Sequence, residues 1–217
     1  SGAYVRGISA PPASHFPVTA GKGAPPAEKA RAFLKQHQAV FMDASAAVDF
    51  RTKKTKDHPS RSYVRLQQDY SGIPVFGAEA TVQLDAAGEV VFAFSDLKRT
   101  TDELDSGHVS LSPALSAAEA ERSAMKHIQR RPAHTPDARG TGPVEPLAMG
   151  WLDPALRLEA SPATLMLFAP EVAGTTGPTR LVWQTAISAL DDPAVSECVL
   201  VDAHSGEIVF HYPIVYA

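Results

Sequence analysis

The segment Gln67–Phe94, QQDYSGIPVFGAEATVQLDAAGEVVFAF, decides the fold of this chain. From Ala78 to Leu84, small or apolar residues alternate with polar ones, which is the period of a half-buried antiparallel strand. The run Asp85–Gly88 then predicts a tight turn into an apolar strand that ends at Phe94. Upstream, Gly72 supplies the backbone freedom that another turn requires. The segment therefore predicts three antiparallel strands joined by two turns.

A second passage, Val199–Tyr212, repeats the hairpin sequence of Val82–Phe94 with one residue added in the turn. Each copy lies downstream of a segment with helical periodicity. The first such segment spans residues 26–41, and the second opens with the capping box Ser116–Glu119. Two copies are too few for a solenoid. The pattern predicts an α+β fold of two tandem domains, each a helix packed on an antiparallel sheet.

These residues also carry a family resemblance. Tyr70–Gly77, YSGIPVFG, together with the hairpin after it, resembles the signature of the fungalysin/thermolysin propeptide domain. Val201–Ile208, VDAHSGEI, resembles the closing strands of the PepSY domain that follows it in the same precursors. The resemblance covers roughly residues 26–215 and implies a cystatin-like fold for each domain. It also implies a non-catalytic propeptide of a secreted, extracellular or periplasmic, thermolysin-like metallopeptidase, whose catalytic domain would hold the zinc and calcium.

Composition along the chain predicts three parts. Residues 1–25 are rich in proline and glycine, which favours a flexible lead-in. Residues 26–105 form the propeptide-like domain, and residues 106–217 form the PepSY-like domain with a C-terminal tail. The boundary falls after a polar stretch, which suits a linker. Within the first domain, the polar and basic run at residues 52–59 predicts a solvated loop.

Charge and length exclude several classes of protein. The chain has 217 residues, a net charge of −4 and 44% hydrophobic residues, which is ordinary for a folded protein. The absence of a basic excess makes nucleic acid a poor partner. No apolar run approaches the roughly 20 residues that a membrane helix needs. The single cysteine, Cys198, cannot form an internal disulfide.

The sequence contains little that predicts catalysis or metal binding. No two of its histidines lie four residues apart, so the zinc-binding helix H-E-x-x-H is absent, as are G-x-S-x-G and P-loop motifs. Asp191-Asp192 precedes a proline and favours a turn over calcium binding. Cys198 could cap a catalytic zinc, but its place in a predicted strand favours a packed thiol. His204 and His211 flank the last hairpin and are interpreted as surface residues.

Two segments are candidates for contact with a partner. The first is the apolar edge of the glycine-bounded run, which either forms an irregular strand edge or docks on the partner; its residues are Ile73, Pro74, Val75 and Phe76. The second is the C-terminal tail, Ile214, Val215, Tyr216 and Ala217. The tail is apolar and follows Pro213 with no further strand to join, which suits an extended peptide in a protease cleft.

The resemblance and these two segments together predict a function. We expect a propeptide that helps a thermolysin-like catalytic domain to fold and inhibits it, with the tail in the active-site cleft. Its partner is the cognate catalytic domain, with no nucleic acid and no membrane. A free-standing protease inhibitor or binding module of the same two domains is the alternative. An enzyme in its own right is disfavoured by the missing catalytic constellation.

Overall fold

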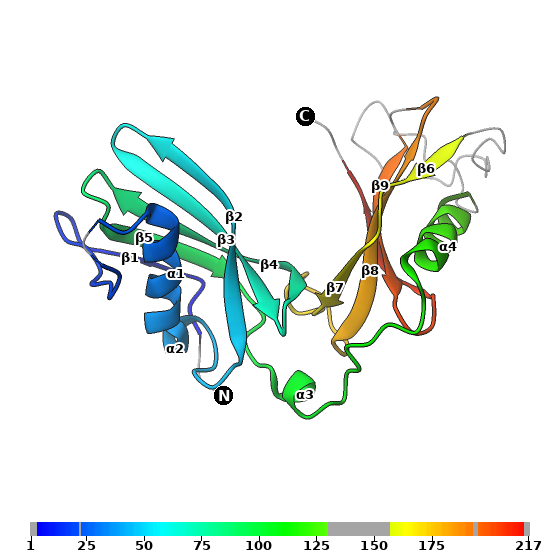
Figure 1. Cartoon of the computed structure of the whole chain (residues 1–217), viewed down its shortest axis with the longest axis horizontal. Coiled ribbons are helices and arrows are strands. Elements are labelled where there is room, and N and C mark those ends of the chain that lie inside the picture. The colour runs from blue at the N-terminus through cyan, green and yellow to red at the C-terminus, as the bar shows by residue number, and fades with distance from the viewer. Residues whose placement is uncertain (1–3, 22, 130–156, 193–194, 215–217) are drawn as a thin grey trace, which may run out of the picture. The chain divides into compact units, whose positions relative to one another are not determined.

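The computed structural model describes residues 4–21, 23–129, 157–192 and 195–214. Its contacts divide the chain into two compact units (Figure 1). The first unit comprises Ser1–Ser110 together with Met166–Arg180, and the second comprises Leu111–Leu165 together with Leu181–Ala217. Both contain helix and sheet, so the fold is α+β as expected. None of the described helices is long and apolar enough to cross a membrane.

The first unit is a helix on an antiparallel sheet (Figure 1). In spatial order its strands are β1 (Gly7–Ser9), β5 (Val90–Asp96), β4 (Ile73–Asp85), β3 (Arg61–Tyr70) and β2 (Val48–His58). Its helices are α1 (Pro26–Gln36), α2 (Gln38–Phe41) and α3 (Asp102–Asp105). The alternation that predicted the β4–β5 hairpin is confirmed, because Ala78, Ala80, Val82 and Leu84 are all at most 1% exposed.

Helix α1 forms where the sequence predicts it and buries one stripe on the sheet. Proline occupies its first turn, where the missing N–H costs nothing. Ala30, Phe33 and Leu34 are buried in the core with the inward residues of β3, β4 and β5. The predicted helix over residues 26–41 is interrupted at His37, whose φ of −108° and ψ of 22° leave the helical region. The remaining turn is α2.

The loop predicted at residues 52–59 is wrong, because most of this run lies in strand β2. Thr52 pairs with Leu66 and His58 with Arg61, so the strand continues to the hairpin turn. From Lys53 to His58 every residue is exposed. An edge strand that is polar on both faces gives no alternating signal, and lysines on such an edge discourage pairing with other chains.

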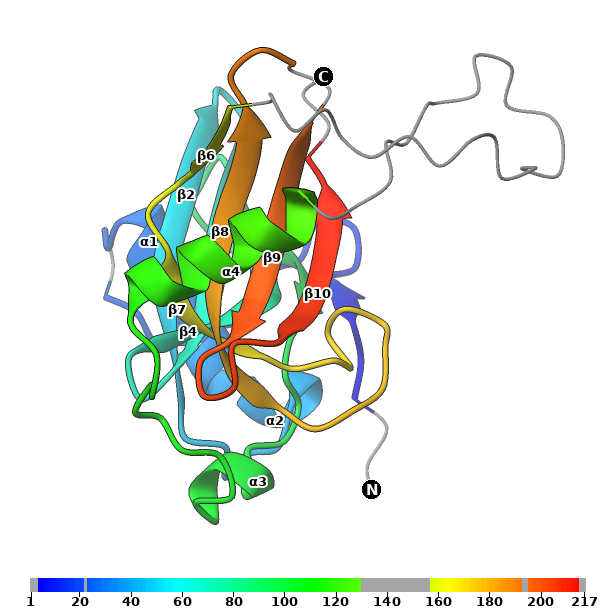
Figure 2. The ribbon, with the colours of Figure 1, turned by 90° about the vertical axis from the view of Figure 1, so that its right-hand side faces the viewer.

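The second unit also packs a helix on antiparallel strands (Figure 2). The spatial order is β6 (Leu158–Ala160), β8 (Arg180–Ala189), β9 (Ser196–Asp202) and β10 (Ile208–Pro213). Helix α4 (Ala117–Gln129) buries Ala120, Ala124 and Ile128 against Ile187, Val199 and Val201. The predicted capping box is present: the Ser116 N–H donates 2.8 Å to the Glu119 carboxylate.

The two sequence repeats use the same turn chemistry. In the first copy, the Asp85 side chain accepts hydrogen bonds from the N–H groups of Ala87 and Glu89, both at 2.9 Å. In the second, Asp202 accepts from His204 and Ser205, also at 2.9 Å. The glycines that complete these turns have φ values of 75° at Gly88 and 78° at Gly206. The repeated aspartate and glycine are therefore explained by the turn, in which the aspartate accepts backbone N–H hydrogen bonds and the glycine takes a positive φ.

Candidate functional site

The glycine-bounded run begins at a two-residue turn between β3 and β4. Ser71 and Gly72 both have positive φ, 50° and 79°, which matches the twist of an antiparallel hairpin. Tyr70 pairs with Ile73 and Asp69 with Pro74, but the next pair joins Gln67 to Glu79. Residues 75–78 therefore leave the ladder with β3. Pro74, which has no N–H to donate, stands where this irregularity begins.

The amide of Gln67 satisfies the backbone groups that the irregularity releases. Its Nε2 atom donates to the carbonyl oxygen of Val75 at 2.7 Å and to that of Ala78 at 3.0 Å. The side chain is buried, with 6% exposure. A buried carbonyl without a donor is costly, so this glutamine makes the departure of β4 from β3 tolerable.

A segment from much later in the sequence covers the same run. Strand β7 (Thr164–Phe168) reaches it through Leu167, which pairs in parallel with Val75. The rings of Phe76 and Phe168 lie 6.1 Å apart. Gly77 has a φ of 71°, and a Cβ built there would lie 3.5 Å from Val172. The run is therefore packed within the first unit.

This packing corrects one part of the predicted docking edge. Val75 is only 1% exposed, so its side chain is not available to a partner. The physical reason is the parallel bridge to Leu167, which no local pattern in the sequence indicates. Ile73, Pro74 and Phe76 are half-buried, and their contact with a partner stays a prediction.

A buried lysine fixes the later segment in place. Lys98 follows β5, is 2% exposed, and donates to Glu103 at 2.7 Å, Glu171 at 3.0 Å and Thr179 at 2.9 Å. Burial raises the pKa of Glu103, but hydrogen bonds from Lys98 and Thr179 outweigh it and leave this pKa below its ordinary value. All three partners and Lys98 belong to the first unit, so the cluster holds residues 166–180 against it.

Only the first residue of the predicted inhibitory tail belongs to the described part of the chain. Ile214 is half-buried, and its N–H donates to the Ser196 carbonyl at 2.8 Å, which extends the pairing of β10 with β9 beyond Pro213. Val215, Tyr216 and Ala217 lie outside the described residues. Ile214 therefore belongs to the paired end of β10.

The other candidate residues have structural partners. Arg157 makes a double hydrogen bond to Asp191, at 2.8 and 3.1 Å. His204 lies 3.1 Å from the Ser112 carbonyl, and His211 lies 3.1 Å from Glu197. In the ranges that the structure describes, no three His, Cys, Asp or Glu side chains gather closely enough to hold a metal ion.

Cys198 lies inside β9 as a packed thiol. It is 2% exposed and accepts from Gln184 Nε2 at 3.4 Å. Burial, followed by the hydrogen bond with Cys198, raises the pKa of the neighbouring Tyr212 to about 12. A thiol placed this way cannot reach a metal on another protein without opening the sheet.

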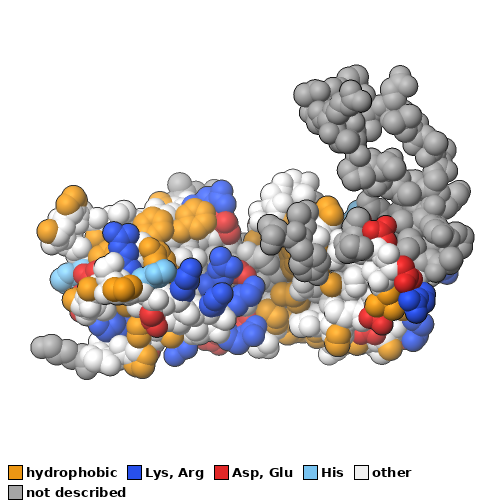
Figure 3. All heavy atoms as spheres, turned by 90° about the horizontal axis from the view of Figure 1, so that it is seen from above, with side chains coloured by type: hydrophobic (Ala, Val, Ile, Leu, Met, Phe, Trp, Pro, Cys, Tyr) orange, Lys and Arg blue, Asp and Glu red, His pale blue; other side chains and the backbone are white. Residues whose placement is uncertain are grey.

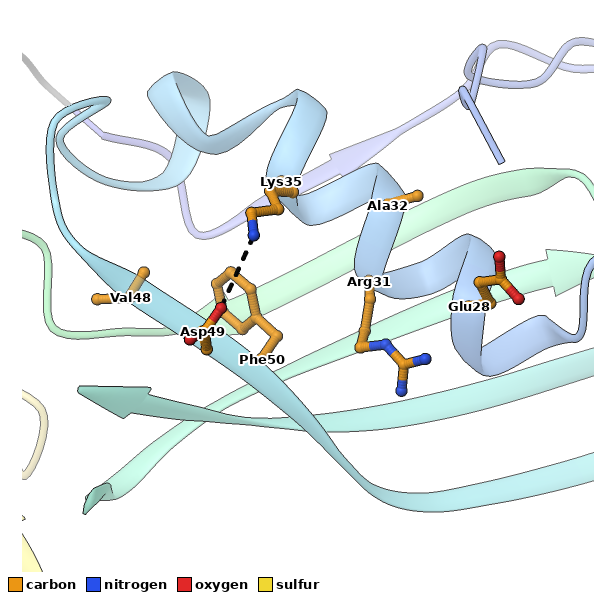
Figure 4. Close-up of a pocket in the computed structure, with 7 residues that line it drawn as sticks. All are labelled: Glu28, Arg31, Ala32, Lys35, Val48, Asp49 and Phe50. Atoms are coloured by element: carbon orange, nitrogen blue, oxygen red, sulfur yellow. Dashed lines mark ion pairs between the residues drawn. The ribbon is translucent and has the colours of Figure 1, made fainter. Parts of the chain in front are cut away.

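A groove of about 470 Å³ lies between α1 and β2 (Figure 4). Ala32, Val48 and Phe50 contribute its apolar lining. Three of the four charged side chains around it are already engaged: Lys35 lies 3.7 Å from Asp49, and Arg31 donates to Thr52 at 2.9 Å. These exposed pairs are weak, and nothing about them selects a ligand. We assign no binding role to the groove.

Sequence reasoning missed the residues that organise the site. Gln67 and Lys98 have no local signature, because their partners include Val75, which lies 8 positions from Gln67, and Glu171 and Thr179, which lie 73 and 81 positions from Lys98.

Residues 51–97 match the Fungalysin/Thermolysin Propeptide Motif. The matched segment runs from β2 to the residue after β5, so it contains the hairpins, Gln67 and the glycine-bounded run. It covers only part of the first unit, and the PepSY resemblance of the second half stays a prediction.

The chain is also similar to bacillolysin from Brevibacillus brevis. The two are 25% identical over 160 residues, which is 73% of this chain and 25% of bacillolysin. The chain thus spans a quarter of that relative. Among solved structures, the chain is similar to the Bacillus megaterium YpeB C-terminal domain, with a match that covers 85% of this chain and 61% of that domain's chain. The two are 10% identical and the TM-score is 0.39, so this similarity carries no argument. The motif and bacillolysin together support a thermolysin-like protease propeptide.

Proposed function

We propose that this chain is the propeptide of a secreted thermolysin-like metallopeptidase, acting as its intramolecular chaperone and inhibitor. The observation that carries the proposal is the propeptide motif at residues 51–97, which coincides with the β2–β5 sheet. The bacillolysin similarity extends support over most of the chain. In this proposal the two units are cystatin-like domains, the second of PepSY type.

The proposed mechanism uses binding rather than chemistry. A partner that binds the native catalytic domain and not its unfolded chain stabilises the native state by mass action. Covalent linkage in a precursor would raise the effective concentration of the propeptide and strengthen this effect. Inhibition would be steric: Ile214–Ala217 would lie extended in the cleft and exclude substrate from the partner's zinc.

Refolding tests the chaperone role. The catalytic domain of Brevibacillus brevis bacillolysin is unfolded in guanidinium and diluted into buffer with or without an equimolar amount of this chain. We expect the chain to increase the recovered peptidase activity, measured after the propeptide is removed. Equal recovery with serum albumin in place of the chain would contradict a specific role.

Truncation tests the inhibitory tail. A variant that ends at Ile214 keeps the hydrogen bond to Ser196, so β10 should remain paired. We expect this variant to bind the native catalytic domain but to inhibit it at least about tenfold less, since the cleft would be empty. A second variant with glycine and serine in place of Val215, Tyr216 and Ala217 keeps the chain length. Undiminished inhibition by both variants would refute the tail mechanism and leave inhibition by the folded units.

A further inference from the structure

The sheet of the first unit carries a second set of side chains, on the face opposite α1. We name it the basic–aromatic face. The register defines it: Tyr63, Gln83 and Phe92 align across β3, β4 and β5, and so do Arg65, Thr81 and Phe94. These residues alternate with the buried residues that face α1, such as Val64 and Val82. Lys54 and Lys56 join the two rows from β2, opposite Arg65 and Tyr63.

Cations outnumber acids on this face. It has seven cations: Arg6, Arg51, Lys53, Lys54, Lys56, Arg61 and Arg65. It has five acids by register: Asp49, Asp69, Glu79, Asp85 and Asp96. The whole chain has a net charge of −4, so the face is opposite in sign to the molecule that carries it. Figure 3 shows lysine and arginine side chains gathered in the first unit beside hydrophobic ones.

Most of the acids are already paired within the sheet. Arg51 donates to Asp69 at 2.9 Å, Glu79 lies between Lys53 at 2.5 Å and Arg65 at 3.4 Å, and Arg6 contacts Asp96. Lys54, Lys56 and Arg61 have no carboxylate partner among the described residues and are exposed. These three cations therefore define the excess charge that a partner could neutralise.

The aromatic side chains of this face add apolar contact surface. Phe94 is 41% exposed, and the Arg6 guanidinium lies 5.6 Å from the centre of its ring. Tyr63 and Phe92 are half-buried beside it. Aromatic and arginine side chains are enriched among the residues that dominate binding energy at protein interfaces. A rigid sheet that presents both has the composition of a docking surface.

We propose that the basic–aromatic face docks on an acidic surface of the protease catalytic domain. This inference rests on the proposed function, and deepens it by naming the surface and the charge of its partner. Complementary charge would act mainly on the association rate, which falls as salt screens the attraction. The aromatic rings would act on dissociation, because they add contact after encounter.

The test measures association of the full chain with the bacillolysin catalytic domain at about 50 and 500 mM salt, where screening differs strongly. The variant is Lys54→Gln/Lys56→Gln/Arg61→Gln. Its control is Lys35→Gln/Arg122→Gln/Lys126→Gln, which removes the same charge from the two helices. We expect the face variant to associate on the order of tenfold more slowly at low salt, with the difference lost at high salt, and the control to match wild type. Phe94→Ala should dissociate faster with an unchanged salt dependence.

The outcomes separate the two proposals. If wild type binds and inhibits while both triple variants behave alike, the docking surface is wrong and the propeptide function stands. If wild type neither binds nor assists any thermolysin-like catalytic domain, the function fails and the surface assignment fails with it. Binding of a single-stranded oligonucleotide that only the face variant loses, with unchanged protease association, would identify nucleic acid as the occupant and overturn the proposal.

Discussion

The Nζ atom of Lys98 lies 2.9 Å from Oγ1 of Thr179, a residue 81 positions later in the sequence. This contact, with those to Glu103 and Glu171, connects the motif-bearing sheet to a segment that follows most of the second unit's sequence. Because Lys98 is only 2% exposed, its substitution should lower the free energy of unfolding of the first unit.

Lys98→Met should destabilise the first unit by about 1–3 kcal/mol, because Thr179 and two carboxylates lose their donor while methionine keeps the volume. The free energy of unfolding in urea gives this value. Hydrogen exchange should accelerate specifically in residues 166–180. The exposed Lys126→Met is the control and should change stability by less than about 0.5 kcal/mol. Equal effects of the two substitutions would show that the buried contacts contribute nothing.

Glu103 should make stability depend on acid pH. Its pKa lies below the ordinary value of 4.5 in the folded chain, so its contribution is present above that value. The contribution is lost as pH falls through the folded-state pKa. Glu103→Gln should therefore show a smaller decrease of unfolding free energy between pH 7 and pH 3 than wild type. Parallel pH curves for the two proteins would rule out this carboxylate as a contributor.

Gln67→Leu should cost about 1–3 kcal/mol, because the carbonyl groups of Val75 and Ala78 would lose a buried donor. Gln83→Leu is the matched control: it makes the same change on the basic–aromatic face, where no described contact is lost, and should stay within about 0.5 kcal/mol of wild type. Urea unfolding compares them. If Gln67→Leu left the free energy of unfolding unchanged, the Gln67 hydrogen bonds to Val75 and Ala78 would not stabilise this part of β4.

Cys198 should react slowly with a thiol reagent such as dithionitrobenzoate in the native chain and rapidly in urea, since the side chain is 2% exposed. Cys198→Ala should leave inhibition of a bacillolysin catalytic domain unchanged. Rapid labelling of the native chain, or loss of inhibition in the variant, would restore the zinc-capping alternative that the sequence left open.

Most of the local structure could be predicted from the sequence, because individual residues determine the strands, the turns and the start of α4. The hairpin from Ala78 to Phe94 alternates because one face is buried on α1, and its turn is fixed by Asp85 and Gly88. The capping box at Ser116 marks α4 correctly. Strand β2 was missed because its outer half is polar on both faces.

The site was less predictable, because its determinants are distant in sequence. Val75 was assigned to an exposed edge, and only the pairing with Leu167 explains its burial. Lys98 reads as an ordinary surface lysine until Glu171 and Thr179 are placed beside it. The basic–aromatic face requires the register of several strands, which periodicity alone does not give.

The first unit is discontinuous along the chain, and this limits how it can be dissected. A fragment that stopped at Ser110 would contain the whole matched motif, yet it would leave Lys98 without Glu171 and Thr179, and Val75 without Leu167. Conversely, a single proteolytic cut between residues 111 and 165 would not release the upstream fragment. That fragment would stay bound to residues 166–180 of the downstream fragment, because both belong to the first unit. Release of this unit would require either a second cut or unfolding.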